Sequence, residues 1–370
     1  MYRLAAAALT VGLLYGQSKQ SPQELLKEAI ALQQQGKLTP AIRDYELFLD
    51  MYPNVAEVRP NLAAALVGTG RYADAIIQYK RALEKKPDPA VRLNLALAYY
   101  KTANFDQAVQ ELEKVRGADA ANVQAVLLLA DCDLRLGRNK NVIELLSPLH
   151  RANPSDLGVA YLLGTALARE GKTTEAQLVI NQITSRGDSA EVRLLMGTAK
   201  FAGHDYRGAL SDIKKAVEMN PNLPDVYSYY GLALLYTGDP VAGRQAFEEE
   251  LQHDANNFDA NLRLGVLLGI DQEYDRALPY LQHALEVRPG DLSARFEIAS
   301  IHSAQGKEDQ ARTELESIVK EAPAFLEAHV TLATIYYREK NKTRGDQERA
   351  IVEKLNAQRQ AEQPGVRASQ

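Results

Sequence analysis

The stretch AVRLNLALAYYKTANFDQAVQELEKV, residues 90–115, decides the fold. Its apolar residues recur every three or four positions, in two runs that a short turn at 102–104 separates. The first run contains Leu93, Ala96, Leu97 and Tyr100, and the second contains Phe105, Ala108, Val109, Leu112 and Val115. This spacing puts each run on one face of an α-helix. The stretch therefore predicts a pair of helices joined by a tight turn.

The helix pair recurs along the chain with a regular period of about 34 residues. Small residues mark the first helix of each unit at Ala29, Ala63, Ala96, Ala130, Gly164, Gly197, Gly231, Gly265, Ala299 and Ala333. A second series follows in the second helix of each unit, at Ala41, Ala75, Ala108, Ala176, Ala209, Gly243, Ala277, Ala311 and Gly345, with Val142 in place of the small residue in the fourth unit. Small residues let two helices cross closely, because larger side chains would overpack the contact. One pair cannot bury both of its apolar stripes, so neighbouring pairs must stack.

Glycine and proline punctuate this period. Glycines between the two helices of a unit, at Gly36, Gly70, Gly137, Gly171, Gly238 and Gly306, are expected to cap the first helix in a left-handed conformation. Prolines at Pro53, Pro87, Pro154, Pro221, Pro289 and Pro323 are expected to end the second helix, since proline cannot continue it.

The pattern resembles the tetratricopeptide repeat, a helix pair whose period is also about 34 residues. The unit from Ala56 carries Leu62-Ala63 at the family's Leu-Gly pair, and Ala75, Tyr79 and Pro87 at its Ala, Phe and Pro positions. The family's tryptophan is absent, since the chain contains none. The resemblance implies an all-α fold: a right-handed α-solenoid of stacked antiparallel helix pairs, with about ten repeats.

The repeats are expected to fill residues 22–360 as one elongated domain. The units start near residues 22, 56, 89, 123, 157, 190, 224, 258, 292 and 326, and the last is a capping pair. Residues 361–370 are expected to form a disordered tail.

The N-terminus has the layout of a secretory signal peptide. Arg3 precedes an apolar run at residues 4–14, and the small residue Gly16 follows. The run is shorter than the roughly 20 residues that span a bilayer. We expect a signal peptide at residues 1–16 and a linker at 17–21, which favours an exported bacterial protein, periplasmic or secreted. The alternative is an ordinary apolar N-terminal helix, in which case the protein is cytoplasmic.

The composition indicates a folded protein without catalytic machinery. An apolar content of 46% excludes wholesale disorder, and a single cysteine excludes an internal disulfide framework. A net charge of −5 argues against nucleic acid as a partner. The sequence contains no G-x-S-x-G, P-loop, G-x-G-x-x-G or H-E-x-x-H motif. We therefore predict no enzyme activity, no cofactor and no metal site.

Three features that could carry chemistry have simpler interpretations. The six histidines are scattered, which favours surface or packing roles. Cys132 lies between Asp131 and Asp133, and adjacent carboxylates oppose thiolate formation, so we expect a buried or inert thiol. The acidic run at residues 248–250 is expected to be a solvated face at the end of a second helix.

The family resemblance implies that ligands lie in a concave groove lined by the first helices. The second, fifth, ninth, twelfth and thirteenth places of each unit face that groove. The candidate protein-binding residues there are Tyr100, Lys101, Arg135, Tyr161, Arg169, Phe201, Tyr236, Phe296, Tyr337 and Arg338. Aromatic residues and arginine are enriched in binding hot spots, although each aromatic could instead pack between helices. The Lys and Asn pairs that bind chaperone tails in one subfamily are not evident.

The sequence thus favours a non-catalytic scaffold that binds a protein or peptide in its concave groove outside the cytoplasm. The alternative is a structural or assembly factor for a cell-envelope or secretion complex, which would act through its convex face or its ends. We expect a monomer with no nucleic-acid partner and no membrane span after signal cleavage.

Overall fold

The computed structural model describes residues 21–184 and 187–362, and every regular element within those ranges is helical. The predicted signal peptide (1–16) and most of the predicted linker (17–21) lie outside the described residues. The predicted tail (361–370) also lies outside them, except that residues 361 and 362 belong to the last helix, which ends at Glu362. The chain divides into two compact units, one that ends at Leu129 and one that starts at Ala130.

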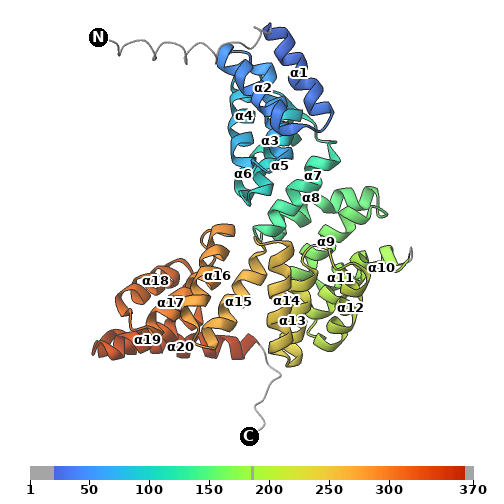
Figure 1. Ribbon diagram of the computed structural model, residues 1–370. Helices are drawn as coiled ribbons and strands as arrows, with labels where there is room; N and C mark the ends of the chain where they lie inside the picture. The colour runs from blue at the N-terminus through green and yellow to red at the C-terminus, as the bar shows by residue number, and fades with distance from the viewer. Residues whose placement is uncertain (1–20, 185–186, 363–370) are drawn as a thin grey trace, which may run out of the picture. The chain divides into compact units, whose positions relative to one another are not determined.

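The first unit is a stack of helix pairs (Figure 1). Its elements are α1 (Pro22–Gln34), α2 (Leu38–Met51), the 3-10 helix η1 (Ala56–Val58), α3 (Arg59–Gly68), α4 (Tyr72–Lys85), α5 (Pro89–Lys101), α6 (Phe105–Ala118) and the start of α7 (Val123–Arg135). Each of α1, α3 and α5 packs against the helix that follows it, and α2 and α4 pack against the next pair. Tyr45, Leu62 and Leu66 are among the fully buried side chains of the resulting core.

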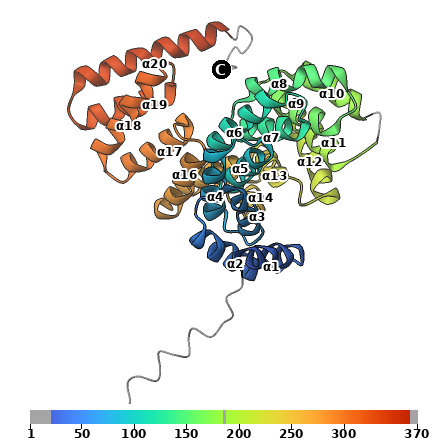
Figure 2. The ribbon, with the colours of Figure 1, turned by 90° about the horizontal axis from the view of Figure 1, so that it is seen from above.

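The second unit continues the same arrangement. It contains the end of α7, then α8 (Asn139–Ala152), α9 (Leu157–Arg169), α10 (Thr173–Thr184), α11 (Ala190–Ala202), α12 (Tyr206–Met219), α13 (Val226–Thr237), α14 (Pro240–His253), α15 (Phe258–Ile270), α16 (Tyr274–Val287), α17 (Leu292–Ala304), α18 (Glu308–Glu321), α19 (Leu326–Arg338) and α20 (Lys342–Glu362). The last helix, α20, packs against α19 and runs past its end (Figure 2). The predicted fold class, an all-α stack of helix pairs, is confirmed.

First helices of neighbouring pairs also contact one another. In the second unit α9 contacts α11, α11 contacts α13, α15 contacts α17, and α17 contacts α19. These contacts make the first helices an inner layer, with the second helices packed outside them. Side chains at equivalent places of successive first helices therefore face the same side of the stack.

The two series of small residues meet where the helices of a pair cross. A Cβ atom built on Gly231 would lie 3.0 Å from the carbonyl oxygen of Gly243 and 2.7 Å from the Phe247 ring. A Cβ atom on Gly265 would lie 3.3 Å from the Ala277 oxygen. These glycines sit against backbone, so the predicted role of small residues as crossing points is confirmed.

The predicted helix caps are also confirmed. Six glycines between paired helices have φ values of +70° to +95°: Gly36, Gly70, Gly137, Gly171, Gly238 and Gly306. Non-glycine residues such as Ala103 and His204 adopt the same left-handed conformation in other units. The turn geometry is therefore common to repeats with and without the glycine.

Replacing Gly231 by leucine tests the crossing directly. We expect Gly231→Leu to lower the free energy of unfolding by about 3 kcal/mol, because the new side chain has no space between α13 and α14. Urea unfolding measures this change. Val241→Leu is the control, since Val241 is 69% exposed on α14 and its substitution should change stability by less than about 0.5 kcal/mol. Equal stabilities for the two variants would contradict the crossing.

Candidate functional site

A pocket of about 350 Å³ opens on the inner layer of the second unit. Its walls come mainly from the first helices α9, α11, α13 and α15, with contributions from the start of α8 and from the residue after α16. Arg169, Phe201, Tyr229, Arg263 and Arg288 are among the side chains that line it. The pocket thus brings guanidinium groups and aromatic rings together.

Arg169, at the last position of α9, is the central residue of this region. Its Nε donates a hydrogen bond to the Tyr229 hydroxyl at 2.7 Å. The guanidinium lies 3.5 Å from the Asp225 carboxylate and 3.8 Å from that of Asp259. Burial lowers the pKa of Arg169, but Tyr229, Asp259 and Asp225 outweigh this effect and leave it above its ordinary value. Arg169 is therefore a fixed cation that joins α9 to α13 and α15.

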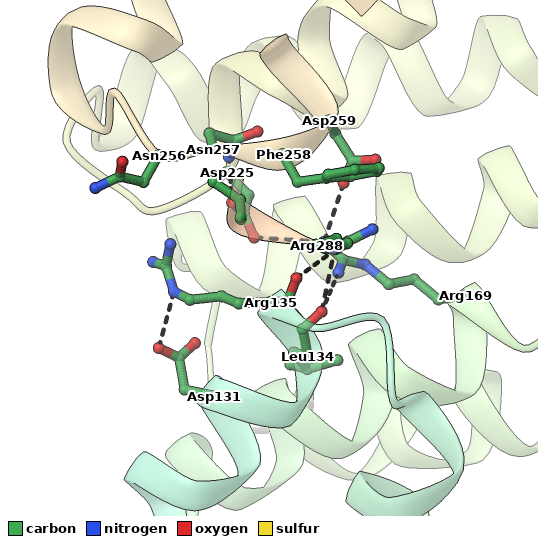
Figure 3. Close-up of a pocket in the computed structure, with 11 residues that line it drawn as sticks. Asp131, Leu134, Arg135, Arg169, Asp225, Asn256, Asn257, Phe258, Asp259 and Arg288 are labelled. Carbon is green, nitrogen blue, oxygen red and sulfur yellow. Dashed lines mark hydrogen bonds and ion pairs between the residues drawn. The ribbon is translucent and has the colours of Figure 1, made fainter. Parts of the chain in front are cut away.

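A second set of contacts ties the end of α7 to the ends of α14 and α16, and we call Arg135, Asp254 and Arg288 the α7 clasp. Figure 3 shows Arg135 and Arg288 of this clasp beside Leu134. Arg135 forms an ion pair with Asp254 at 2.6 Å, and also pairs with Asp131 on its own helix. Arg288 donates hydrogen bonds to the backbone oxygens of Arg135 and Leu134, and its guanidinium stacks 3.8 Å from the Phe258 ring centre. A cation on the final carbonyls of a helix is favourable, because they carry partial negative charge.

Asp225, which lies beside Arg169, belongs to a network of buried carboxyl groups. Asp225, which precedes α13, has a φ of +63°, and its Oδ1 accepts a hydrogen bond from Asn257 at 2.7 Å. Glu250 is 2% exposed and accepts hydrogen bonds from the backbone N–H groups of Asp225, Tyr227 and Ser228. Burial, followed by repulsion from Asp225, raises the pKa of Glu250 to about 8.

The prediction of a solvated face at residues 248–250 is therefore wrong for Glu250. The side chains of Glu248 and Glu249 are 45% and 44% exposed, as expected. Glu250 instead points inward and holds the start of α13, because three backbone donors there need an acceptor.

Four candidate residues from the sequence meet in the region of the pocket. Arg169 and Phe201 line it, and Arg135 belongs to the adjacent clasp. Tyr161 interacts with the Asp225 carboxylate of the same region. Burial, followed by this carboxylate, raises the pKa of Tyr161 well above its ordinary value.

An aromatic cluster extends the site from Phe201 toward solvent. The rings of Phe201 and Tyr236 are 5.1 Å apart, and both contact Tyr206, at 5.2 and 4.7 Å. Tyr236 is 53% exposed. Tyr236 is therefore connected to the pocket through Phe201, which lines the pocket and meets the Tyr236 ring edge to face.

The other five candidates lie elsewhere. Tyr100 and Lys101 belong to the first unit, where the Tyr100 ring packs on Phe105 at 5.5 Å. Phe296 packs on Phe325 at 5.4 Å, which is the alternative role of packing between helices. Tyr337 donates a hydrogen bond to Asp346, and Arg338 forms an ion pair with Glu308.

Sequence reasoning did not single out Asp225, Asp259, Arg263 and Arg288. A signal existed for two of them, since Asp225 and Asp259 both occupy the second place of their units, counted from residues 224 and 258. Pairing arginines at the thirteenth place with aspartates at the second place would have suggested the contacts of Arg169. Nothing comparable marked Arg288, which follows α16.

The predicted simple interpretation of Cys132 is confirmed. The thiol is fully buried, and burial, followed by Asp131, raises its pKa. Within residues 21–184 and 187–362, no three His, Cys, Asp or Glu side chains are grouped so as to hold a metal ion. Among the helices of the same ranges, none has the length and apolar content of a bilayer-spanning segment.

Comparison with known proteins supports the repeat architecture. Models described as tetratricopeptide repeat match residues 26–90, 194–260, 230–291 and 270–334, and a model of anaphase-promoting complex, cyclosome, subunit 3 matches residues 68–149. The tetratricopeptide repeat matches together cover more than half of the chain. The second helices pack outside the first in the manner of a helical repeat scaffold. The chain belongs to the tetratricopeptide repeat family.

Individual relatives are distant. The chain is 26% identical to a protein CTR9 homolog of Arabidopsis thaliana over 70% of its own length and 25% of the relative. It is 21% identical to anaphase-promoting complex subunit 3 of Schizosaccharomyces pombe over 75% of its own length and 43% of the relative. The chain thus spans less than half of these curated relatives. A crystal structure of the yeast Tom70 matches 91% of this chain and 76% of its own, with 19% identity and a TM-score of 0.41.

The buried carboxyls predict a pH dependence of stability. The pKa of Glu250 is raised to about 8 from an ordinary value of 4.5, and the pKa of Asp225 is also raised, mainly by burial. The folded state therefore holds protons that the unfolded state has released. The contribution of these two carboxyl groups to the free energy of unfolding is therefore largest below about pH 4.5. It falls as the pH rises to about 8, by at most about 1.4 kcal/mol per pH unit for each group.

Urea unfolding between pH 5 and 8.5 measures this decline. We expect Asp225→Asn to flatten it, because the variant removes one buried carboxyl and the main repulsion on the other. Asp309→Asn, at a side chain that is 90% exposed, is the control and should leave the slope unchanged. Parallel profiles for Asp225→Asn and the wild type would contradict the network.

Proposed function

We propose that the protein is a non-catalytic scaffold that binds an extended segment of a partner protein on the inner layer of its second unit. Helical repeat proteins generally use the surface that their stacked first helices present. The observation that carries the proposal is the pocket on α9, α11, α13 and α15, which continues into the aromatic cluster of Phe201, Tyr206 and Tyr236. Arginine and tyrosine are the residue types that contribute most to protein-binding hot spots.

The alternative is a structural or assembly factor for an envelope or secretion complex that binds through its outer helices. The observation in its favour is a set of exposed apolar side chains there. Leu178 on α10 is 60% exposed and Val241 on α14 is 69% exposed. Scattered apolar residues are common on protein surfaces, so we favour the inner layer.

We further propose that the protein acts outside the cytoplasm as an exported bacterial member of its family. The support is the N-terminal pattern of one arginine, an apolar run at residues 4–14 and the small residue Gly16. An ordinary cytoplasmic location follows if that segment is retained.

Photocrosslinking in the native host distinguishes the two binding surfaces. A photoreactive phenylalanine analogue replaces either Tyr236, beside the pocket, or Val241, on an outer helix. Both positions are more than half exposed, so the analogue should leave the fold intact. We expect a discrete crosslinked partner at position 236 and none at position 241. Crosslinks at position 241 alone would favour the assembly factor, and an absence of both would contradict the scaffold.

Protein sequencing tests the proposed export. The full chain is expressed with its own N-terminus in a Gram-negative bacterium, and the cells are separated into cytoplasmic and periplasmic fractions. We expect the periplasmic protein to begin at Gln17, because cleavage follows Gly16. A variant with Leu9→Arg breaks the apolar run and should remain uncleaved. Cytoplasmic wild-type protein that begins at Met1 would rule the signal out.

A further inference from the structure

We infer that the pocket on the inner layer binds the carboxylate of an acidic residue in the partner's segment, with an apolar neighbour of that residue on the aromatic cluster. This inference rests on the proposed function and specifies the chemistry of the segment. It follows from the charges of the pocket, from two unpartnered polar groups in its wall, and from its position beside exposed rings.

The pocket carries more cations than its own carboxylates neutralise. Arg169, Arg263 and Arg288 all line it, and Asp259 is the acidic residue in its wall. Asp259 and Asp225 both approach Arg169, at 3.8 and 3.5 Å. Among the described residues, Arg263 and Arg288 have no carboxylate within ion-pair distance. Carboxylates act on these two arginines only from beyond ion-pair distance: Glu297 on Arg263, and Asp259, Asp291 and Asp225 on Arg288. An anion that enters the pocket would meet two guanidinium groups without an acidic partner.

Arg288 is stabilised without being neutralised. Its hydrogen bonds go to backbone oxygens at the end of α7, and the face of its guanidinium rests on the Phe258 ring. Burial lowers its pKa, which reflects the cost of holding a cation away from water. Backbone dipoles offset part of that cost but bring no full negative charge. A carboxylate in the pocket would complete the compensation.

Two buried polar atoms in the wall specify more than an anion. The Nε of Arg263 is buried and donates no hydrogen bond, and the Oδ1 of Asn139 is buried and accepts none. The Asn139 amide nitrogen is already used, since it donates to Glu170 at 3.3 Å. The wall thus needs one acceptor and one donor. An acidic residue in a peptide supplies both, a carboxylate oxygen for Arg263 and a backbone N–H for Asn139, whereas a fully ionised phosphate supplies acceptors alone.

The aromatic cluster extends this specificity along the segment. Phe201 belongs both to the pocket wall and to the cluster, so a residue next to the acid would reach its ring. Tyr236 is half exposed and offers a surface for an apolar or aromatic side chain. The pocket volume of about 350 Å³ accommodates one side chain with its backbone, so the remainder of the segment would lie on the inner layer.

Selection from a random twelve-residue peptide library on the full chain tests the inference. We expect enriched peptides to contain Asp or Glu next to an apolar or aromatic residue. A fluorescent copy of the most enriched peptide should bind at least tenfold more weakly when its acid is replaced by the amide. It should lose at least tenfold in affinity for Arg263→Gln, because a charged hydrogen bond is removed.

Matched variants separate the pocket from general charge and from folding. Arg276→Gln removes the same charge from an exposed position on α16 and should leave the affinity unchanged. Asn139→Ala should weaken binding without changing charge, and Arg263→Lys should retain part of the affinity. Each variant is first checked by thermal melting. Arg169 and Arg288 are left intact because both also donate hydrogen bonds to backbone oxygens at the end of α7.

The possible results separate this inference from the proposed function. Enriched peptides without acids, equal binding by Arg263→Gln and wild type, or no enrichment at all would overturn the inference. If position 236 still crosslinks a partner in that case, the scaffold stands and only the acidic specificity fails. Displacement of the peptide by equimolar inorganic phosphate, or capture of the protein by phosphatidylglycerol vesicles through Arg263, would assign the pocket to phosphate and also overturn the inference.

Discussion

The close crossing of the two helices within each pair is the constraint on which the rest of the structure depends. Where Gly231 meets the backbone of Gly243, the helix axes can approach no further and no other residue type fits as well. The crossing fixes how each apolar stripe faces the next pair. Since it recurs once in every repeat unit, equivalent places of successive first helices face the same side. Arg135 and Arg169, which occupy the same place in successive units, reach one region for this reason.

The fold could be predicted because its determinants are local and periodic. The helices, the left-handed caps and the crossing points each depend on residues within one unit. The partners of Arg169 are different, since Asp225 and Asp259 lie two and three repeats further along the chain. Which units meet depends on small rotations between successive pairs, and these accumulate along the stack. Residue spacing contains no measure of that rotation, so the arginines could be proposed and their aspartates could not.

The error at Glu250 has a related cause. A run of three acidic residues at a helix end is typical of a solvated face, and Glu248 and Glu249 follow that rule. Glu250 differs because the start of α13, the other helix of its own pair, and the side chain of Asn257 supply donors to it. The need for an acceptor at a helix start is a local rule, but its source here lies 25 residues away, which no helical periodicity indicates.

The pocket wall carries the opposite sign to the whole chain: it holds Arg169, Arg263 and Arg288 against Asp259, while the chain has a net charge of −5. The fold obtains this reversal by satisfying Arg288 with carbonyls and an aromatic ring in place of a carboxylate. Such partners hold a guanidinium in position and leave its charge in place. A carboxylate of the chain's own at Arg263 would stabilise the folded state and close the pocket to other anions. A stack held together by apolar crossings can tolerate the unneutralised cations, because its stability comes from contacts that lie outside the pocket.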